Sequence, residues 1–215
     1  MEIDPASAAL LIIDVQNDFC PGGSLAVKHG DEVIEPLNRL AAAFARGSGK
    51  VIATQDWHPR KHISFASSHT EPQTLNSKDQ VLWPDHCVRE TAGADFHKDL
   101  DMANVQLILR KGYRIELDSY SAFFENDRKT STGLDGFLKG LGIKNIVMGG
   151  LATDYCVFYS AMDAVQQGFT VIIAEDAVRG VDIPAGSVEK AFSILRKSGV
   201  QFINSMEITL KKFGE

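Results

Sequence analysis

Short apolar runs alternate along the chain with longer segments in which apolar residues recur every three or four positions. The short runs predict buried strands, and the longer segments predict amphipathic helices. Strands are expected at residues 8–13, 51–54, 105–109, 145–148, 170–174 and 201–203. Helices are expected at residues 33–46, 133–141, 153–167 and 185–198, and glycines at positions 47, 168 and 199 end three of them.

This alternation of strand and helix predicts an α/β fold. The predicted strands are apolar on both faces, which is typical of a parallel sheet covered by helices on each side. We therefore expect a three-layer α/β/α architecture with a mainly parallel central sheet. The chain has 215 residues without a low-complexity linker, so a single domain spanning residues 1–215 is expected.

The segment from about residue 55 to residue 104 interrupts this alternation, because it shows little periodicity. It carries both tryptophans and five of the six histidines. A segment this long without regular structure is usually functional or disordered, and disordered segments are poor in aromatic residues. We therefore expect a functional loop region here.

Composition narrows the function classes. Acidic residues number 28 against 22 basic residues, a formal charge of −6, whereas nucleic-acid-binding proteins usually carry a basic face. No apolar stretch approaches the ~20 residues needed to span a bilayer, and no targeting segment opens the chain. The sequence thus predicts a cytoplasmic protein without nucleic-acid or membrane partners. A homo-oligomer is an open expectation, because α/β domains of this kind often associate.

Chemically active residues follow the predicted strands at their carboxyl ends, where ligands bind in parallel α/β sheets. Asp14 ends the first strand, and Lys111 follows the third. Asp56 and His58 follow the second, and the fourth leads into a glycine-rich turn that carries Cys156. Each residue alone has a structural explanation, but together they predict an active site at one edge of the sheet.

The chain has three cysteines, Cys20, Cys87 and Cys156, an odd number at wide spacing. This pattern does not make a disulfide framework and fits a reducing compartment. Cys156 differs from the other two because it is predicted in the first turn of a helix, where the helix dipole and free N–H groups favour a thiolate.

These residues suit nucleophilic acyl transfer. A Cys156 thiolate would attack a carbonyl carbon, Asp14 would accept or relay the proton, and Lys111 would balance the charge. Backbone N–H groups of the turn, those of Ala152 and Cys156 above all, would form an oxyanion hole for the tetrahedral intermediate.

A second group of residues has the spacing of a metal site. Asp56 and His58 lie two positions apart on an extended segment, so their side chains point to the same side. Together with His86 they would make an open metal site, and His62 lies close by in the sequence. Loop residues that make ordinary hydrogen bonds explain the same spacing equally well, so both interpretations stand.

Several sequence blocks resemble the nicotinamidases (pyrazinamidases) of the isochorismatase-like cysteine hydrolase superfamily. The blocks fall in order over nearly the whole chain, and those around Asp14, Lys111 and Cys156 are common to the superfamily. The blocks that contain the predicted metal residues are more specific. The blocks are DVQNDF at 14–19, PGGSL at 21–25, TQDWHP at 54–59, WPDHC at 83–87, KG at 111–112, YSAF at 120–123 and GLATDYCV at 150–157.

The resemblance implies a role for each matching residue. Cys156 would be the nucleophile, Asp14 the general base and Lys111 the third member of a catalytic triad. One divalent metal would be bound by Asp56, His58 and His86. Zn²⁺ is the first candidate, and Fe²⁺ and Mn²⁺ are the others. Some members have a further histidine ligand six residues after the first. In this chain His62 follows His58 by four residues. His62 is therefore an additional candidate, either as a ligand or as a hydrogen-bond donor to one of the ligands.

The resemblance also implies the substrate and its pocket. The substrate would be nicotinamide, hydrolysed to nicotinate and ammonia in NAD salvage, with pyrazinamide as a further substrate. Its pyridine nitrogen would bind the metal, and Phe19 and Trp83 would hold its ring, with Tyr120 nearby. Leu151 is a further candidate substrate-binding residue. The peptide bond between Leu151 and Ala152 would be cis.

Two other interpretations remain. One is a metal-independent relative, an isochorismatase-like or carbamoyl-amide hydrolase, which metal analysis of the purified protein would distinguish. The other is a silent binding or scaffold protein on the same fold. The intact set of Asp14, Lys111 and Cys156 argues against a silent protein, because such a protein could lose any of them.

Overall fold

The central sheet has six strands, and all neighbouring strands run parallel. The computed structural model describes residues 1–69 and 81–211. The strand order is β4-β3-β2-β5-β6-β7. The strands are β2 (Ala8–Ile13), β3 (Lys50–Asp56), β4 (Leu107–Lys111), β5 (Asn145–Leu151), β6 (Thr170–Arg179) and β7 (Gln201–Ile203). A separate parallel pair, β1 (Glu2–Ile3) with β8 (Thr209–Leu210), joins the two ends of the described chain.

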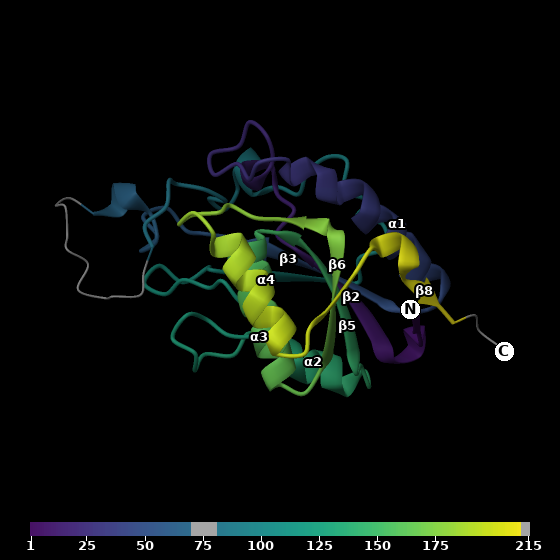
Figure 1. Cartoon of the computed structure of the whole chain (residues 1–215). Helices are drawn as coiled ribbons and strands as arrows, with labels where there is room; N and C mark the ends of the chain where they lie inside the picture. The colour runs from purple at the N-terminus through teal and green to yellow at the C-terminus, as the bar shows by residue number, and fades with distance from the viewer. Residues whose placement is uncertain (70–80, 212–215) are drawn as a thin grey trace.

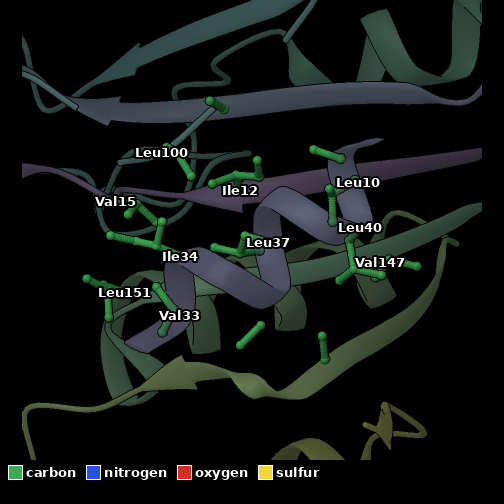
Figure 2. Packing of buried hydrophobic residues seen from close by; sticks show 14 of the residues in the cluster. Leu10, Ile12, Val15, Val33, Ile34, Leu37, Leu40, Leu100, Val147 and Leu151 are labelled. Carbon is green, nitrogen blue, oxygen red and sulfur yellow. The ribbon is translucent and has the colours of Figure 1, made fainter. Parts of the chain in front are cut away.

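Helices cover both faces of the sheet (Figure 1). Helix α1 (Ile34–Arg46) packs on one face, and α2 (Leu134–Gly140), α3 (Phe158–Gln166) and α4 (Ser187–Lys197) pack on the other. Alternate residues of β2 enter the two cores, because side chains in a strand point to opposite faces. Leu10 and Ile12 meet α1 residues such as Leu37 (Figure 2), whereas Leu11 belongs to the opposite core. The predicted three-layer α/β/α fold is confirmed.

The structure corrects some element boundaries. Strand β4 starts two residues later than expected and lies at the sheet edge, so its side chains alternate between covered and exposed, and Ile108 is 48% exposed. Strands β5 and β6 extend beyond their apolar runs. The helix expected from residue 153 begins instead as a π-helical turn, Thr153–Val157, which leads into α3.

The long segment after β3 is irregular over the described residues, as predicted, and residues 70–80 of it lie outside them. The side chain of Gln16 fastens it to the sheet, because Nε2 donates to the backbone oxygens of Asp56 and Ala94. No helix in the described part of the chain has the length and apolar character that crossing a membrane requires. Short 3₁₀ turns occur at Pro5–Ser7, Asn17–Phe19, Gly30–Val33, Ala66–Ser68, Ala92–Ala94 and Ser205–Glu207.

Candidate active site

The sheet brings the residues predicted from the strand ends to one edge. Strands β4, β3, β2 and β5 are consecutive neighbours, and they end in the same direction. Lys111 closes β4 beside Asp56, its register partner at the end of β3. Asp14 directly follows β2, and Cys156 lies in the π-helical turn after β5. Parallel pairing alone therefore places all four side chains together.

Lys111 lies at the centre of this group. Its Nζ is 2.8 Å from Asp14 Oδ2 and 2.5 Å from Asp56 Oδ1. It is also 3.3 Å from Cys156 Sγ and donates to the backbone oxygen of Ser119 at 3.0 Å. The side chains of Lys111 and Asp14 are completely buried. A buried ammonium between two carboxylates and a thiol fixes the relative positions of all three.

Thr54 orients the Asp14 carboxylate. Its hydroxyl donates to Asp14 Oδ1 at 2.6 Å and accepts from the Asp14 backbone N–H at 3.1 Å. Asp14 has a φ of +48°, in the left-handed region that residues other than glycine rarely adopt. The backbone thus turns sharply at the strand end, and Thr54 and Lys111 hold the carboxylate from two sides.

Burial and charge set the protonation states of the pair. Burial opposes the charge on Lys111, but Asp14 and Asp56 outweigh it and hold the pKa of the ammonium well above its usual value. Burial raises the pKa of Asp14, against the opposing effect of Lys111. Lys111 is therefore charged, and Asp14 is an aspartate with unusual affinity for a proton, which is what a general base needs.

The structure corrects the expected thiolate. Burial raises the pKa of Cys156 well above its usual value, and the neighbouring carboxylates Asp14 and Asp56 add to this effect, against Lys111. Complete enclosure beside two negative charges outweighs the helix dipole from which the thiolate was predicted. The direction of this shift favours the thiol over the thiolate.

Asp56, His58 and His86 form a compact donor group at the pocket wall. One ligand atom from each lies within 4.8 Å of the others, and all three residues are buried. His58 Nδ1 faces the Gly112 carbonyl oxygen at 2.8 Å, and His86 Nδ1 faces that of Pro84 at 2.8 Å. These contacts leave the Nε2 atom of each ring for a cation, as in metal sites where backbone carbonyls fix the ligating histidines.

The charge state of the group also fits a divalent cation. Burial lowers the pKa of His86 to about 4, so its imidazole is neutral near pH 7. Burial opposes the ionisation of Asp56, but Lys111 and His58 outweigh it and keep its pKa below the usual range. Burial likewise opposes the charge on His58, whose pKa is nevertheless raised by Asp56. His58 Nε2 lies 3.5 Å from Asp56 Oδ2, so a cation between them would contact both residues.

His62 lies behind this group. Its ring stacks on His58 with centroids 4.2 Å apart, and its Nδ1 contacts Ser64 Oγ at 2.7 Å. Its potential ligand atoms cluster with those of His58 and Asp118, and not with Asp56 and His86. The geometry favours His62 as a support for His58 over a direct ligand. The buried Asp118 was missed from the sequence, because it lies in an irregular stretch without a spacing signal.

A pocket opens above Cys156 and beside the donor group. Phe19, Trp83 and Tyr120 line it as predicted, and Trp83 Nε1 donates to the Tyr120 hydroxyl at 3.1 Å. Sequence reasoning missed four further lining residues, which come from loops and the π-helical turn. These are Leu25, Asp118, Tyr155 and Val181.

Leu151 differs from its predicted role. Its side chain is fully buried and packs in the core near Val33 and Ile34 (Figure 2), and it is not among the residues that line the pocket. As the last residue of β5 it points into the α1 face and is not placed to contact a substrate in this pocket. The peptide bond between Leu151 and Ala152 is cis, as expected, and Ala152 lines the pocket.

Comparisons with known proteins identify the family of the chain. Residues 8–207 match the family described as the isochorismatase domain. The nicotinamidase of Acinetobacter baylyi is 45% identical over 94% of this chain and 94% of its own length. A nicotinamidase/pyrazinamidase structure from Acinetobacter baumanii has a TM-score of 0.89 and 46% identity, covering 95% of this chain and 99% of that one.

A third relative was solved with a metal. The structure of the pyrazinamidase of Pyrococcus horikoshii in complex with zinc has a TM-score of 0.78 and 33% identity, and the match covers 92% of this chain and 99% of that one. The extent of these matches, together with the geometry at the strand ends, shows that this chain belongs to the isochorismatase family of hydrolases, in its nicotinamidase/pyrazinamidase branch.

Proposed function

We propose that the protein hydrolyses nicotinamide to nicotinate and ammonia through a cysteine thioester, in NAD salvage. The observation that carries this proposal is the contact of Lys111 with Asp14 and Cys156 at the base of a pocket whose wall holds Asp56, His58 and His86. The triad supplies amide hydrolysis, and the donor group supplies recognition of a heteroaromatic ring. Pyrazinamide, which also has a ring nitrogen and a carboxamide, is a further substrate.

Asp14 moves the proton in the first half of the reaction. Cys156 Sγ attacks the carboxamide carbon while its proton passes to Asp14, whose raised pKa favours acceptance. The backbone N–H groups of Ala152 and Cys156 stabilise the oxyanion. Asp14 then gives the proton to the leaving nitrogen, and ammonia departs from the thioester.

The second half reuses the same base. Asp14 takes a proton from a water molecule that attacks the thioester carbon, and then returns it to Cys156 Sγ as the carbon–sulfur bond breaks. Lys111 stays protonated throughout and stabilises whichever of its neighbours carries the negative charge. The net reaction consumes one water and releases nicotinate and ammonia.

Asp56, His58 and His86 would hold the divalent ion. When bound, this ion supplies a Lewis-acidic position for the pyridine nitrogen, which orients the carboxamide toward Cys156. Phe19 and Trp83 enclose the ring and exclude water from it.

Ammonia release from nicotinamide by the purified protein, with and without a chelator, tests the function. We expect hydrolysis by the protein as purified and one equivalent of metal. Removing the metal should lower kcat/KM about 10- to 100-fold, mainly through KM, because a charge-assisted contact to the substrate is worth roughly 1.5–3 kcal/mol. A metal-free protein with unchanged kcat/KM would favour the metal-independent relatives.

Gly112→Ala tests the metal group independently of catalysis. A Cβ at this position would lie 2.4 Å from His58 Cε1, and Gly112 has a φ of +62°. The added methyl group must displace the His58 ring and its contact with the Gly112 oxygen. We expect metal affinity to fall about 10- to 100-fold, as for other losses of groups that orient metal ligands. Competition with a chelator measures this affinity without substrate.

Gly142→Ala is the matched control. Gly142 has a φ of +72°, but a Cβ there meets no atom within 4 Å. The two variants share the backbone penalty of a positive φ, and only Gly112→Ala disturbs a histidine. Equal metal affinity in both variants would show that His58 is not a ligand.

A further inference from the structure

The carboxylate of Asp154 occupies a central place that the proposed reaction does not use. Asp154 lies in the π-helical turn between Ala152 and Cys156, and it is 8% exposed. It does not line the pocket above Cys156. A buried carboxylate next to the nucleophile, but turned away from the substrate, needs another explanation.

The loop between β6 and α4 wraps around this carboxylate. Asp154 Oδ1 accepts the Val181 backbone N–H at 3.0 Å. Its Oδ2 accepts the Asp182 N–H at 3.0 Å and the Ser187 hydroxyl at 2.5 Å. Two backbone N–H groups of the loop and the hydroxyl of the first α4 residue thus converge on one side chain. Hydrogen bonds to a charged acceptor are the stronger kind, so the carboxylate binds the loop firmly to the turn.

The loop is itself shaped to hold these donors. Asp182 Oδ1 accepts the Gly186 N–H at 2.9 Å, which closes the loop on itself. A Cβ on Gly180 would lie 2.2 Å from Val188 and 3.0 Å from Asp154 Oδ1, so the backbone passes too close for any side chain. The backbone at Gly180 therefore lies directly against the carboxylate of Asp154.

A second hydrogen bond joins the π-helical turn to the loop. The Tyr155 hydroxyl donates to the Ile183 backbone oxygen at 2.6 Å. Tyr155 and Val181 also line the catalytic pocket. The loop thus touches the substrate pocket on one side and the turn carrying the nucleophile on the other.

Resting on the proposed function, we infer that Asp154 is a positioning residue that fixes the oxyanion-binding turn and Cys156 against the loop between β6 and α4. Ala152 lies two residues before it in the chain and Cys156 two residues after it. A turn released from the loop would misplace both the N–H donors and the sulfur. The metal donors and the predicted ring contacts of Phe19 and Trp83 come from other segments and would stay in place.

Asp154→Asn tests this inference with almost no change in shape. The asparagine amide would place an NH₂ group against donors that now face a carboxylate oxygen, so at least one hydrogen bond is lost and replaced by repulsion. We expect kcat per active site to fall on the order of 10- to 100-fold, the effect of a small misplacement of reacting groups. KM for nicotinamide should change less than kcat, because Phe19, Trp83 and the metal donors lie on other segments and only Tyr155 and Val181 of the pocket wall belong to the turn and the loop.

Pyridine-3-carbaldehyde provides a readout that a purely structural role would not move. The Cys156 sulfur adds to its carbonyl carbon, the C=O π bond breaks, and the thiol proton ends on the new hydroxyl oxygen. The product resembles the tetrahedral intermediate. Its affinity should fall in Asp154→Asn by a factor similar to that in kcat, since oxyanion contacts contribute to both.

Asp176→Asn is the matched control. Asp176 also accepts a backbone N–H and a hydroxyl, both from Ser205, at 2.7 and 2.5 Å, and it does not line the pocket. Its loss should lower thermal stability while kcat per active site and aldehyde affinity stay unchanged.

Ser187→Ala gives a second route if Asp154→Asn does not fold. It removes one of the three donors and leaves the carboxylate, so we expect the same pattern at a smaller amplitude, about two- to fivefold, as for one hydrogen bond. Absence of hydrolysis by the wild-type protein would reject the proposed function. If the wild type hydrolyses nicotinamide and Asp154→Asn keeps its kcat and aldehyde affinity, the positioning role alone is rejected. If Asp154→Asn does not fold, the same unchanged values in Ser187→Ala reject it.

Discussion

Replacing Cys156 with alanine should abolish nicotinamide hydrolysis and leave binding of the metal and of nicotinamide largely intact. The sulfur is the group that would form the thioester, and it lies 3.3 Å from Lys111 Nζ at the base of the pocket. Removal of a nucleophile that acts as a unit with its base lowers kcat on the order of 10⁴- to 10⁶-fold. The metal donors and the ring pocket come from other segments, so they should keep their geometry.

Ammonia release measures the activity of this variant, and titration with nicotinamide measures its binding. Cys20→Ala is the matched control, because Cys20 is also buried, at 1% exposed, but belongs to the hydrophobic core. It should lose some stability and retain activity. Hydrolysis by Cys156→Ala at a rate near that of the wild type would remove the covalent mechanism.

Alkylation of the wild-type protein gives a second view of the same thiol. Burial raises the pKa of all three thiols, that of Cys20 to about 11 and those of Cys87 and Cys156 well above the usual value, so the pKa direction does not separate them. Only Cys156 has both a base and an ammonium in contact, so it should react fastest with iodoacetamide. Mass spectrometry of the digested protein identifies the modified residue.

The sequence was sufficient to predict the fold and the convergence of the triad. Apolar runs of strand length alternated with helical patterns, which left a parallel sheet as the consistent solution. The carboxyl ends of such strands share one edge, so Asp14, Asp56 and Lys111 had to be neighbours if β2, β3 and β4 were adjacent, as they are. The turn after β5 adds Cys156 for the same reason.

Other features depend on contacts that no local pattern encodes. The protonation state of Cys156 follows from its enclosure by Asp14 and Asp56, whereas position at a helix start predicted the opposite. Asp118 reaches the donor group from an irregular segment, and its spacing carried no signal. Leu151 turns into the core because of the direction in which β5 presents its last side chain.

Lys111→Met should destabilise the protein and shift its activity to higher pH. The methionine fills the same space but leaves Asp14 and Asp56 buried together without the ammonium that pairs with both. Removing one partner of a buried ion pair typically costs about 3–5 kcal/mol in the free energy of unfolding. Lys111 also lowers the pKa of Asp14, so its loss raises that pKa further. Asp14 would then become a carboxylate only at a higher pH than in the wild type, so activity should rise at higher pH.

Chemical denaturation measures the stability loss, and kcat/KM against pH measures the shift. Adding Asp14→Asn to Lys111→Met removes one of the two unpaired carboxylates, so stability should recover in part while activity does not. Lys139→Met is the control, because this lysine is 49% exposed and its pair with Asp135 spans 3.5 Å. Loss of such a surface pair should change stability by no more than about 1 kcal/mol. If Lys111→Met is as stable as the wild type, the two carboxylates do not both depend on this ammonium. The role of Lys111 in positioning Asp14 as a base would then also be rejected.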